Sequence, residues 1–269
     1  MTAVEAWLEA CRAAVADIRG LLLELPTRVE REPVLRRGEG GDDTTAIDAG
    51  AEALVLERLA AVEEGFTLVS EEAGELVFNG GGRIRVVVDP IDGSVNAKRG
   101  IPFFALSVAV ADGPAMGDVF FGYVYDFGSG EEWVARRGEG AFLDGAALGG
   151  VAPKDTIEIL AFEATVTKLI AEKAPDVAAI AKRLRIMGSL ALSLCHLAAG
   201  RVDAVCSLKE ARAIDIAAGQ LLVREVGIPI ELAGGPPFVE APLDLEGRSR
   251  VVAAGTRELC RELATALLR

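Results

Sequence analysis

The sequence contains very little histidine and few aromatic residues. It holds one histidine, His196, in 269 residues, and aromatic residues make up 5%, so the core should be mostly aliphatic. A single histidine in practice rules out a histidine-based zinc site. No G-x-S-x-G segment occurs, and His196 lies in the apolar segment SLALSLCHLAAG, which argues against a Ser-His-Asp triad. We expect His196 to be a satisfied core residue, and a catalytic base is the less favoured alternative.

Basic residues are also few. The chain has 28 lysine and arginine residues against 41 aspartate and glutamate residues, which gives a net charge of −13. Binding a polyanion usually needs a basic stripe, so we do not expect nucleic acid as the main partner. A small phosphorylated molecule would be repelled as well, unless metal ions reverse the local field. The alternative is that the acidic surface serves only solubility.

Signals for export, membrane insertion and disulfide bonding are missing. The N-terminal segment is amphipathic and has no basic stretch before an apolar block, which argues against a signal peptide. No run of about 18 uncharged apolar residues exists, so we expect no membrane span. The four cysteines show no C-x-x-C spacing, so we expect buried thiols in a cytoplasmic protein. They are Cys11, Cys195, Cys206 and Cys260.

Side-chain amides are scarce, being limited to Asn79, Asn96 and Gln220. Depletion of these thermolabile residues fits a thermophile, although a GC-rich genome would produce part of the same bias. In a hyperthermophile an intracellular disulfide would become possible.

Nucleotide-binding loops are absent, since neither G-x4-G-K-[ST] nor G-x-G-x-x-G occurs. The most informative stretch is R-V-V-V-D-P-I-D-G-S-V-N at 85–96. A short β-branched run ends at Asp89, and we expect Pro90 to stop this strand because proline cannot donate to a sheet ladder. Asp89 and Asp92 can share a hard cation, and the amides of Gly93 and Ser94 can receive an anion.

Other acidic residues stand at the ends of predicted elements. Glu71 and Glu72 follow a predicted strand, while Asp48 and Asp215 open predicted helices. Each alone is weak evidence, because acidic residues are ordinary in first turns of helices. Ligands bind at strand ends of α/β sheets, and Mg²⁺ prefers carboxylates and phosphate oxygens, so together these residues indicate a metal site.

The order of elements predicts an α/β protein in two parts. Residues 1–150 should hold an antiparallel meander and most metal ligands, and residues 151–269 should alternate strands and helices and contribute Asp215. We place the boundary at the glycine-rich segment 145–153 and expect a mobile loop at 28–44, with a short strand at 34–35. The expected helices are 2–24, 47–64, 165–183 with a break at Pro175, 189–199, 214–226 and 256–268. The expected strands are 66–69, 84–89, 103–111, 117–125, 132–135, 157–162, 184–187, 202–206, 228–231 and 250–254, with turns at 79–82 and 137–140.

Three segments, taken together, resemble the inositol monophosphatase superfamily: D-P-I-D-G-S at 89–94, S-E-E at 70–72 and I-D-I-A-A-G at 214–219. The resemblance covers nearly the whole chain and is greatest to the archaeal branch, which acts on inositol phosphates and often on fructose 1,6-bisphosphate. It implies a five-layer αβαβα sandwich, usually dimeric. It also implies a Mg²⁺-dependent phosphatase whose lithium sensitivity varies in that branch.

The resemblance also implies the metal ligands. Glu71, Asp89 and the carbonyl of Ile91 would hold one Mg²⁺ ion, and Asp89, Asp92 and Asp215 would hold a second. A third, weaker ion would lie near Glu71.

Catalytic roles follow from the same resemblance. Ser94 with Glu71 would orient the attacking water and take its proton. Thr45 and Asp48 match a family T-x-x-D segment and would anchor the third ion or polarise water. The substrate-side residues would be Asp92, Gly93, Ser94, Gly188, Ser189 and Arg212.

The chain departs from the family pattern at several positions. Ser94 replaces the commoner threonine, and Ile214 replaces a tryptophan, which puts substrate choice in doubt. The usual lysine of the 28–44 loop is missing, and Arg36 or Arg37 would stand in for it. Arg212, with Lys209 nearby, would take a second phosphate, or else is a solvated surface charge.

We therefore expect a Mg²⁺-dependent phosphomonoesterase, a cytoplasmic homodimer, that acts on inositol-1-phosphate, with fructose 1,6-bisphosphate as the expected second substrate. The alternatives are a 3′-phosphoadenosine-5′-phosphate phosphatase of the same superfamily and a non-catalytic, metal-dependent sugar-phosphate sensor.

Overall fold

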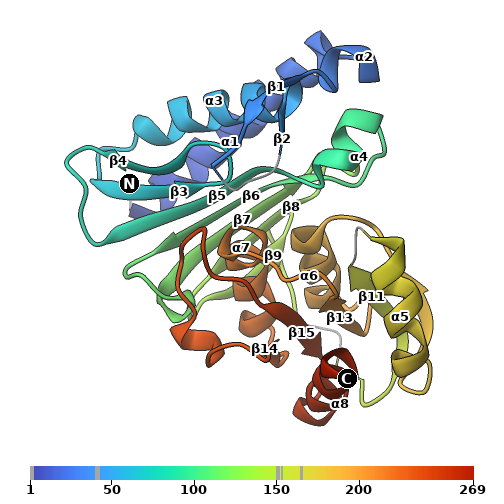
Figure 1. Ribbon diagram of the computed structural model, residues 1–269. Coiled ribbons are helices and arrows are strands. Elements are labelled where there is room, and N and C mark those ends of the chain that lie inside the picture. The colour runs from blue at the N-terminus through green and yellow to red at the C-terminus, as the bar shows by residue number, and fades with distance from the viewer. Residues whose placement is uncertain (1–2, 40–42, 150–151, 153, 164–165) are drawn as a thin grey trace.

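The computed structural model describes residues 3–39, 43–149, 152, 154–163 and 166–269. Figure 1 shows five stacked layers of alternating helices and sheets. Helices α1 (Ala3–Glu24) and α3 (Ala46–Ala60) form the first layer, α6 (Leu190–Ala198) and α7 (Ala213–Glu225) the third, and α5 (Thr167–Val177) and α8 (Arg257–Leu268) the fifth. A large sheet and a smaller sheet lie between them, so the expected αβαβα sandwich is confirmed.

The large sheet is mostly antiparallel. Strands β5 to β9 pair as a meander, of which the part from β6 to β8 was predicted, whereas β3 and β5 run parallel. Parallel strands end at the same edge of a sheet, so the segments that follow β3 and β5 come together there. Among the described residues the order is β10 (Ala146–Ala147), β9 (Gly140–Leu143), β8 (Glu132–Arg136), β7 (Val119–Asp126), β6 (Ala105–Ala111), β5 (Ile84–Asp92), β3 (Phe66–Ser70) and β4 (Gly74–Phe78).

The outer face of the large sheet is covered by α1 and α3. Trp7 of α1 meets Phe66 of β3 edge to face, with ring centroids 5.3 Å apart, and both side chains are fully buried. Ile47 and Val55 of α3 join the same core. Apolar residues of both helices recur on one face, and this burial holds α3 against the sheet.

Helices α6 and α7 fill the space between the two sheets. α7 approaches β7 closely at Gly122, where a Cβ would stand 2.8 Å from the carbonyl oxygen of Ala218. Gly219 of α7 lies against α6 in the same way, since a Cβ added there would stand 2.9 Å from the Cβ of Leu194. These glycines let the helix backbone lie near its neighbours, and thereby bring the start of α7 to the end of β5.

The smaller sheet has the order β12 (Ala181–Arg185), β11 (Ile157–Glu163), β13 (Ala204–Ser207), β15 (Arg250–Ala254) and β14 (Ile230–Ala233) within the described chain. β11 is parallel to both of its neighbours, and the β13–β15 and β14–β15 pairs are antiparallel. Phe162 of β11 and Leu263 of α8 pack in the core on its outer face. All four cysteines are buried and free, as the sequence predicted.

The segment 28–44 is more regular than expected. It contains a short helix α2 (Arg28–Arg31) and a two-stranded hairpin of β1 (Val34–Arg37) and β2 (Asp43–Thr45), and residues 40–42 lie outside the described part. The strand expected at 34–35 is present as part of β1. A capping box between Thr27 and Glu30 explains why α2 forms.

Two predictions about the effect of proline, a strand end at Pro90 and a helix break at Pro175, are wrong. Strand β5 continues through Pro90 to Asp92, with a shift in register between Asp89 and Asp92 against β6, because proline is tolerated where a bulge interrupts the ladder. Pro175 lies inside α5 without breaking it, and the missing amide costs the helix one hydrogen bond. The helix expected at 165–183 instead ends at Val177, and β12 follows; residue 165 lies outside the described chain.

The remaining differences are small. Strand β4 was not predicted, and β9 begins at Gly140 inside a predicted turn. Short helices occur at α4 (Ser94–Arg99), η1 (Met116–Asp118) and η2 (Phe238–Glu240). Of the predicted boundary at 145–153, residues 150, 151 and 153 lie outside the described chain, and the division into 1–150 and 151–269 stays a prediction. None of the helices in the described ranges is long and apolar enough to cross a membrane.

Candidate metal centre

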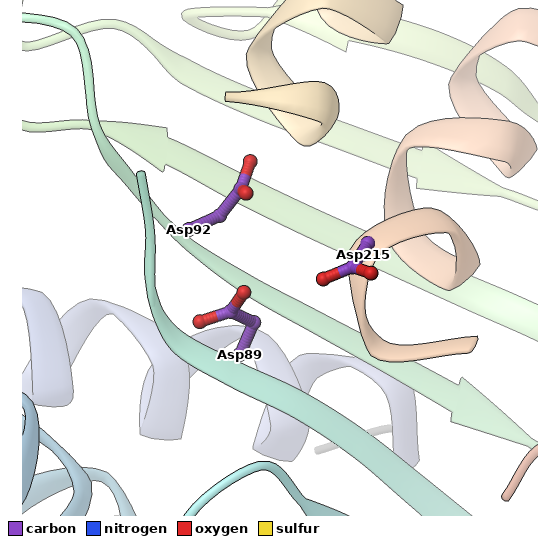
Figure 2. Close-up of side chains that lie close together, drawn as sticks. All are labelled: Asp89, Asp92 and Asp215. Atoms are coloured by element: carbon purple, nitrogen blue, oxygen red, sulfur yellow. The ribbon is translucent and has the colours of Figure 1, made fainter. Parts of the chain in front are cut away.

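Three aspartates from distant parts of the chain meet at the end of β5. Asp89 and Asp92 belong to β5, and Asp215 belongs to the first turn of α7. One carboxylate oxygen from each lies within 4.8 Å of the other two, and Figure 2 shows the three side chains close together, with the carboxylates of Asp89 and Asp215 facing each other. The set is typical of a site for a hard divalent cation, which prefers oxygen ligands.

The local backbone explains how Asp89 and Asp92 reach the same point. The register shift between them adds an irregular step to β5, so neither carboxylate follows the simple alternation of a strand. The amide of Ile91 donates to Asp89 Oδ1 at 3.0 Å, and this fixes the turn of the chain around Pro90. The hydroxyl of Ser94 donates to the carbonyl oxygen of Ile91 at 3.0 Å, next to the carboxylates.

Burial makes Asp89 and Asp92 costly to ionise. Asp89 is 3% exposed and Asp92 is 7% exposed. Burial, followed by the charges of Glu71, Asp92 and Asp215, raises the pKa of Asp89 well above its ordinary value. Burial is also the main cause that raises the pKa of Asp92 to about 7. A cation among these groups would relieve the repulsion, so the donor set and its charge fit a divalent metal.

Glu71 lies beside this cluster and is paired with Arg212. Arg212 Nη2 is 2.6 Å from Glu71 Oε1 and 3.4 Å from Asp215 Oδ1. Burial raises the pKa of Glu71 to about 7, against the opposing charge of Arg212. The amide of Arg212 also donates to Asp215 Oδ2 at 2.7 Å, which caps α7 and fixes this aspartate. Arg212 is therefore a buried cation among the carboxylates, and the alternative of a solvated surface charge is wrong.

Thr45 and Asp48 form the start of α3, which covers the outer face of the large sheet. The amide and hydroxyl of Thr45 donate to Asp48 Oδ2 at 3.1 and 2.5 Å, as in a capping box. Asp48 Oδ1 is buried and has no hydrogen-bond partner. A buried carboxylate oxygen without a donor is unusual, and it is available to a ligand, water or ion.

Glu52 is a buried carboxylate that the sequence analysis did not select. It accepts hydrogen bonds from the hydroxyl of Ser70 at 2.7 Å and from the amide of Ala73 at 2.8 Å, and it pairs with Arg36 at 3.1 Å. Through these bonds it fixes both ends of the turn that carries Glu71. Its position one helical turn after Asp48 was the available signal, because residues i and i+4 share a helix face.

The turn before α6 contacts Asp92 directly. The hydroxyl of Ser189 donates to Asp92 Oδ2, and the amide of Ala191 donates to the same oxygen at 2.8 Å. Gly188 has a φ of 87° and lies close to Gly93, whose added Cβ would stand 3.2 Å from the Gly188 carbonyl oxygen. The predicted pairs 93–94 and 188–189 are thus brought together beside Asp92.

Two further candidates, His196 and Arg36, are engaged with neighbouring side chains. His196 stacks on Phe103 with ring centroids 5.6 Å apart, and its pKa is lowered mainly by burial, as expected for a packed residue. Arg36, a proposed substitute for the missing lysine, is engaged with Glu52.

The chain is similar to known phosphatases along nearly its whole length. The sequence model described as "Inositol monophosphatase family" matches residues 5–268. A protein of Methanothermobacter thermautotrophicus named fructose-1,6-bisphosphatase/inositol-1-monophosphatase is 34% identical over 87% of this chain and 86% of its own length. The Escherichia coli protein named Nus factor SuhB is 35% identical over 85% of this chain and 86% of its own. A crystal structure described as an inositol monophosphatase-fructose 1,6-bisphosphatase superposes with a TM-score of 0.83 and 28% identity, covering 97% of this chain and 99% of that one.

Proposed function

Because the chain belongs to the inositol monophosphatase family and is a phosphoric monoester hydrolase, we propose that it uses magnesium to hydrolyse inositol-1-phosphate and fructose 1,6-bisphosphate. The observation that carries the proposal is the meeting of Asp89, Asp92 and Asp215 from two distant segments. Three carboxylates at one point, two of them buried, are unfavourable for folding, so a cation that binds them offers the simplest reason for their presence. The name of the Methanothermobacter relative supports this pair of substrates.

The proposed ligands divide into two groups. Glu71, Asp89 and the carbonyl of Ile91 would hold one magnesium ion, and Asp89, Asp92 and Asp215 would hold another. When bound, magnesium supplies positive charge that makes an attacking water more acidic and stabilises the departing oxygen. Asp89 belongs to both groups, which makes it the residue most sensitive to substitution.

Other side chains would orient the attacking water and accept its proton. The Ser94 hydroxyl lies near the carboxylates through its bond to the Ile91 carbonyl, and Glu71 has a pKa of about 7, which suits a group that accepts a proton near neutral pH. Asp48 Oδ1, which has no partner, would accept a hydrogen bond from water or help to hold a third, weaker ion. Thr45 holds the other oxygen of Asp48 and so sets its orientation.

Arg212 is the proposed contact for a second phosphate. In the structure its guanidinium balances Glu71 and Asp215. A cation on these carboxylates would take over that role and leave Arg212 able to bind an anionic group of the substrate. The first phosphate and the polyol would contact Gly93 and Ser94 on one side and Gly188 and Ser189 on the other. A bisphosphate substrate follows naturally from this arrangement.

Initial rates of phosphate release test the proposal. Inositol-1-phosphate, fructose 1,6-bisphosphate and 3′-phosphoadenosine-5′-phosphate should be compared with Mg²⁺ or EDTA, each with and without Li⁺. We expect Mg²⁺-dependent turnover of the first two. Preference for the adenosine compound would favour the nucleotide phosphatase instead. Binding of these compounds without turnover would point to a sensor. Light scattering on the eluted protein would test the proposed homodimer.

A further inference from the structure

Glu163 is a buried carboxylate that none of the proposed steps uses. It is the last residue of β11 and is 6% exposed. Its two oxygens accept three hydrogen bonds: from the Ser193 hydroxyl at 2.6 Å, the Gly188 amide at 2.9 Å and the Met187 amide at 3.4 Å. Burial raises the pKa of Glu163, so its retention in the interior costs free energy that these contacts offset.

All three donors of Glu163 belong to one short piece of chain. Met187 and Gly188 form the turn before α6, and Ser193 lies in the first part of that helix. A carboxylate with two acceptor oxygens is the side chain best able to hold two successive amides and a hydroxyl at once. Glu163 therefore fixes the turn and the start of α6 relative to the smaller sheet.

The same turn is held from the opposite side by the large-sheet half of the molecule. Asn96 Nδ2 donates to the carbonyl oxygens of Met187 at 2.7 Å and Phe103 at 2.8 Å. A Cβ on Gly188 would stand 3.1 Å from the same amide nitrogen, so the turn has little room to shift. The position of the turn is set jointly by Glu163 and Asn96.

The turn leads into the two groups that donate hydrogen bonds to Asp92. The Ser189 hydroxyl and the Ala191 amide both bind Asp92 Oδ2 and restrict rotation of that carboxylate. Each link in the path from Glu163 through Gly188 and Ser189 to Asp92 is a hydrogen bond or an adjacent peptide. The path reaches Asp92 without involving Asp89 or Asp215.

We infer that Glu163 is a positioning residue for Asp92: it holds the turn at Gly188 so that the start of α6 orients the carboxylate toward the metal. This rests on the proposed function, since it assigns Asp92 to a bound cation. Groups that orient a metal ligand through hydrogen bonds typically contribute about 10- to 100-fold to metal affinity or activity.

The test compares Glu163→Gln with Glu158→Gln, a change of the same kind on an exposed residue of the same strand, where Glu158 pairs with Arg183. Mn²⁺ is the probe, and the free ion is measured by electron paramagnetic resonance during titration of each folded protein. We expect Glu163→Gln to weaken Mn²⁺ binding and to lower kcat/KM by about 10- to 100-fold, with Glu158→Gln unchanged. Equal Mn²⁺ affinities for the two variants would overturn the inference.

Ser189→Ala, alone and combined with Glu163→Gln, tests the path. If Glu163 acts through Ser189, the double variant should bind Mn²⁺ more tightly than the product of the single effects predicts. Multiplicative effects would contradict the path. If Glu163→Gln fails to fold, Ser193→Ala removes one donor from Glu163 and should still weaken Mn²⁺ binding; an unchanged affinity would overturn the inference. A wild-type protein that neither binds Mn²⁺ nor releases phosphate would instead refute the proposed function.

Discussion

Replacing Asp92 with asparagine should stabilise the protein in EDTA while abolishing most of its response to magnesium. Asparagine keeps a carbonyl oxygen that can accept from Ser189 and Ala191, so the contacts at Asp92 Oδ2 are preserved. What is removed is one negative charge next to Asp89 and Asp215. The substitution therefore separates the cost of the buried charge from the packing of the site.

The magnitude follows from the pKa of Asp92, which rises from an ordinary 3.8 to about 7. Above pH 7, keeping this group ionised in the folded state costs roughly 4 kcal/mol relative to the unfolded chain. Hydrogen bonds to a neutral amide are about half as strong as those to a carboxylate, so we expect a net gain of about 2 kcal/mol at pH 8. For a chain of this size that corresponds to a Tm higher by about 5 °C.

The raised pKa of Asp92 also determines the direction in which the stability of the wild type changes with pH. Between about pH 4 and pH 7 the folded wild type binds more protons at Asp92 than the unfolded chain does, so its stability falls as the pH rises through this range. The advantage of Asp92→Asn should be largest at pH 8 and shrink toward pH 4. Added Mg²⁺ should raise the Tm of the wild type much more than that of the variant.

Thermal melts in EDTA at several pH values, with and without Mg²⁺, measure these effects. Asp126→Asn is a suitable control, because Asp126 is also buried and bonded, to Gly128 and Ser129, but lies outside the aspartate cluster. A variant Asp92→Asn that melts below the wild type at pH 8 in EDTA would refute the reasoning, as would a gain in Tm that does not depend on pH.

Three other substitutions test other residues of the site. Ser94→Ala should lower kcat by about 100-fold with little change in KM, measured by initial rates, because the hydroxyl is assigned to the water and not to binding. Arg212→Lys should raise KM by about 10-fold for fructose 1,6-bisphosphate and much less for inositol-1-phosphate, since lysine cannot reproduce the paired donors of the guanidinium. Gly188→Ala should cost about 1–3 kcal/mol in denaturant melts from its φ of 87° and its contact with Asn96, and more than Gly138→Ala, which has a φ of 77° and open space around it.

The local signals in the sequence were sufficient for most of the architecture. Strand period and turn residues predicted the meander, and β15 begins and ends where expected. The segments D-P-I-D-G-S and I-D-I-A-A-G led to the aspartates that the structure brings together. The predictions gave Pro90 and Pro175 too large an effect. The cost of the missing backbone amide depends on whether a carbonyl partner for it exists at that position.

The supporting residues of the site could not be predicted in the same way. Glu163 and Glu52 have no motif, and their roles come from hydrogen-bond partners 16 to 30 residues away in the chain. The role of Arg212 stayed open in the sequence, since only the fold places it between Glu71 and Asp215. Tertiary contacts between separate elements decide these roles, and no periodic pattern in the sequence predicts them.

The central claim is that the aspartate cluster makes this chain a metal-dependent phosphatase. The most direct measurement is the rate of phosphate release from inositol-1-phosphate and fructose 1,6-bisphosphate by the wild type and Asp89→Asn, each with Mg²⁺ or EDTA. We expect turnover by the wild type only with Mg²⁺, and a loss of at least about 1,000-fold in Asp89→Asn, because Asp89 would serve both ions. Equal rates for the two proteins, or a wild-type rate that EDTA leaves unchanged, would contradict it.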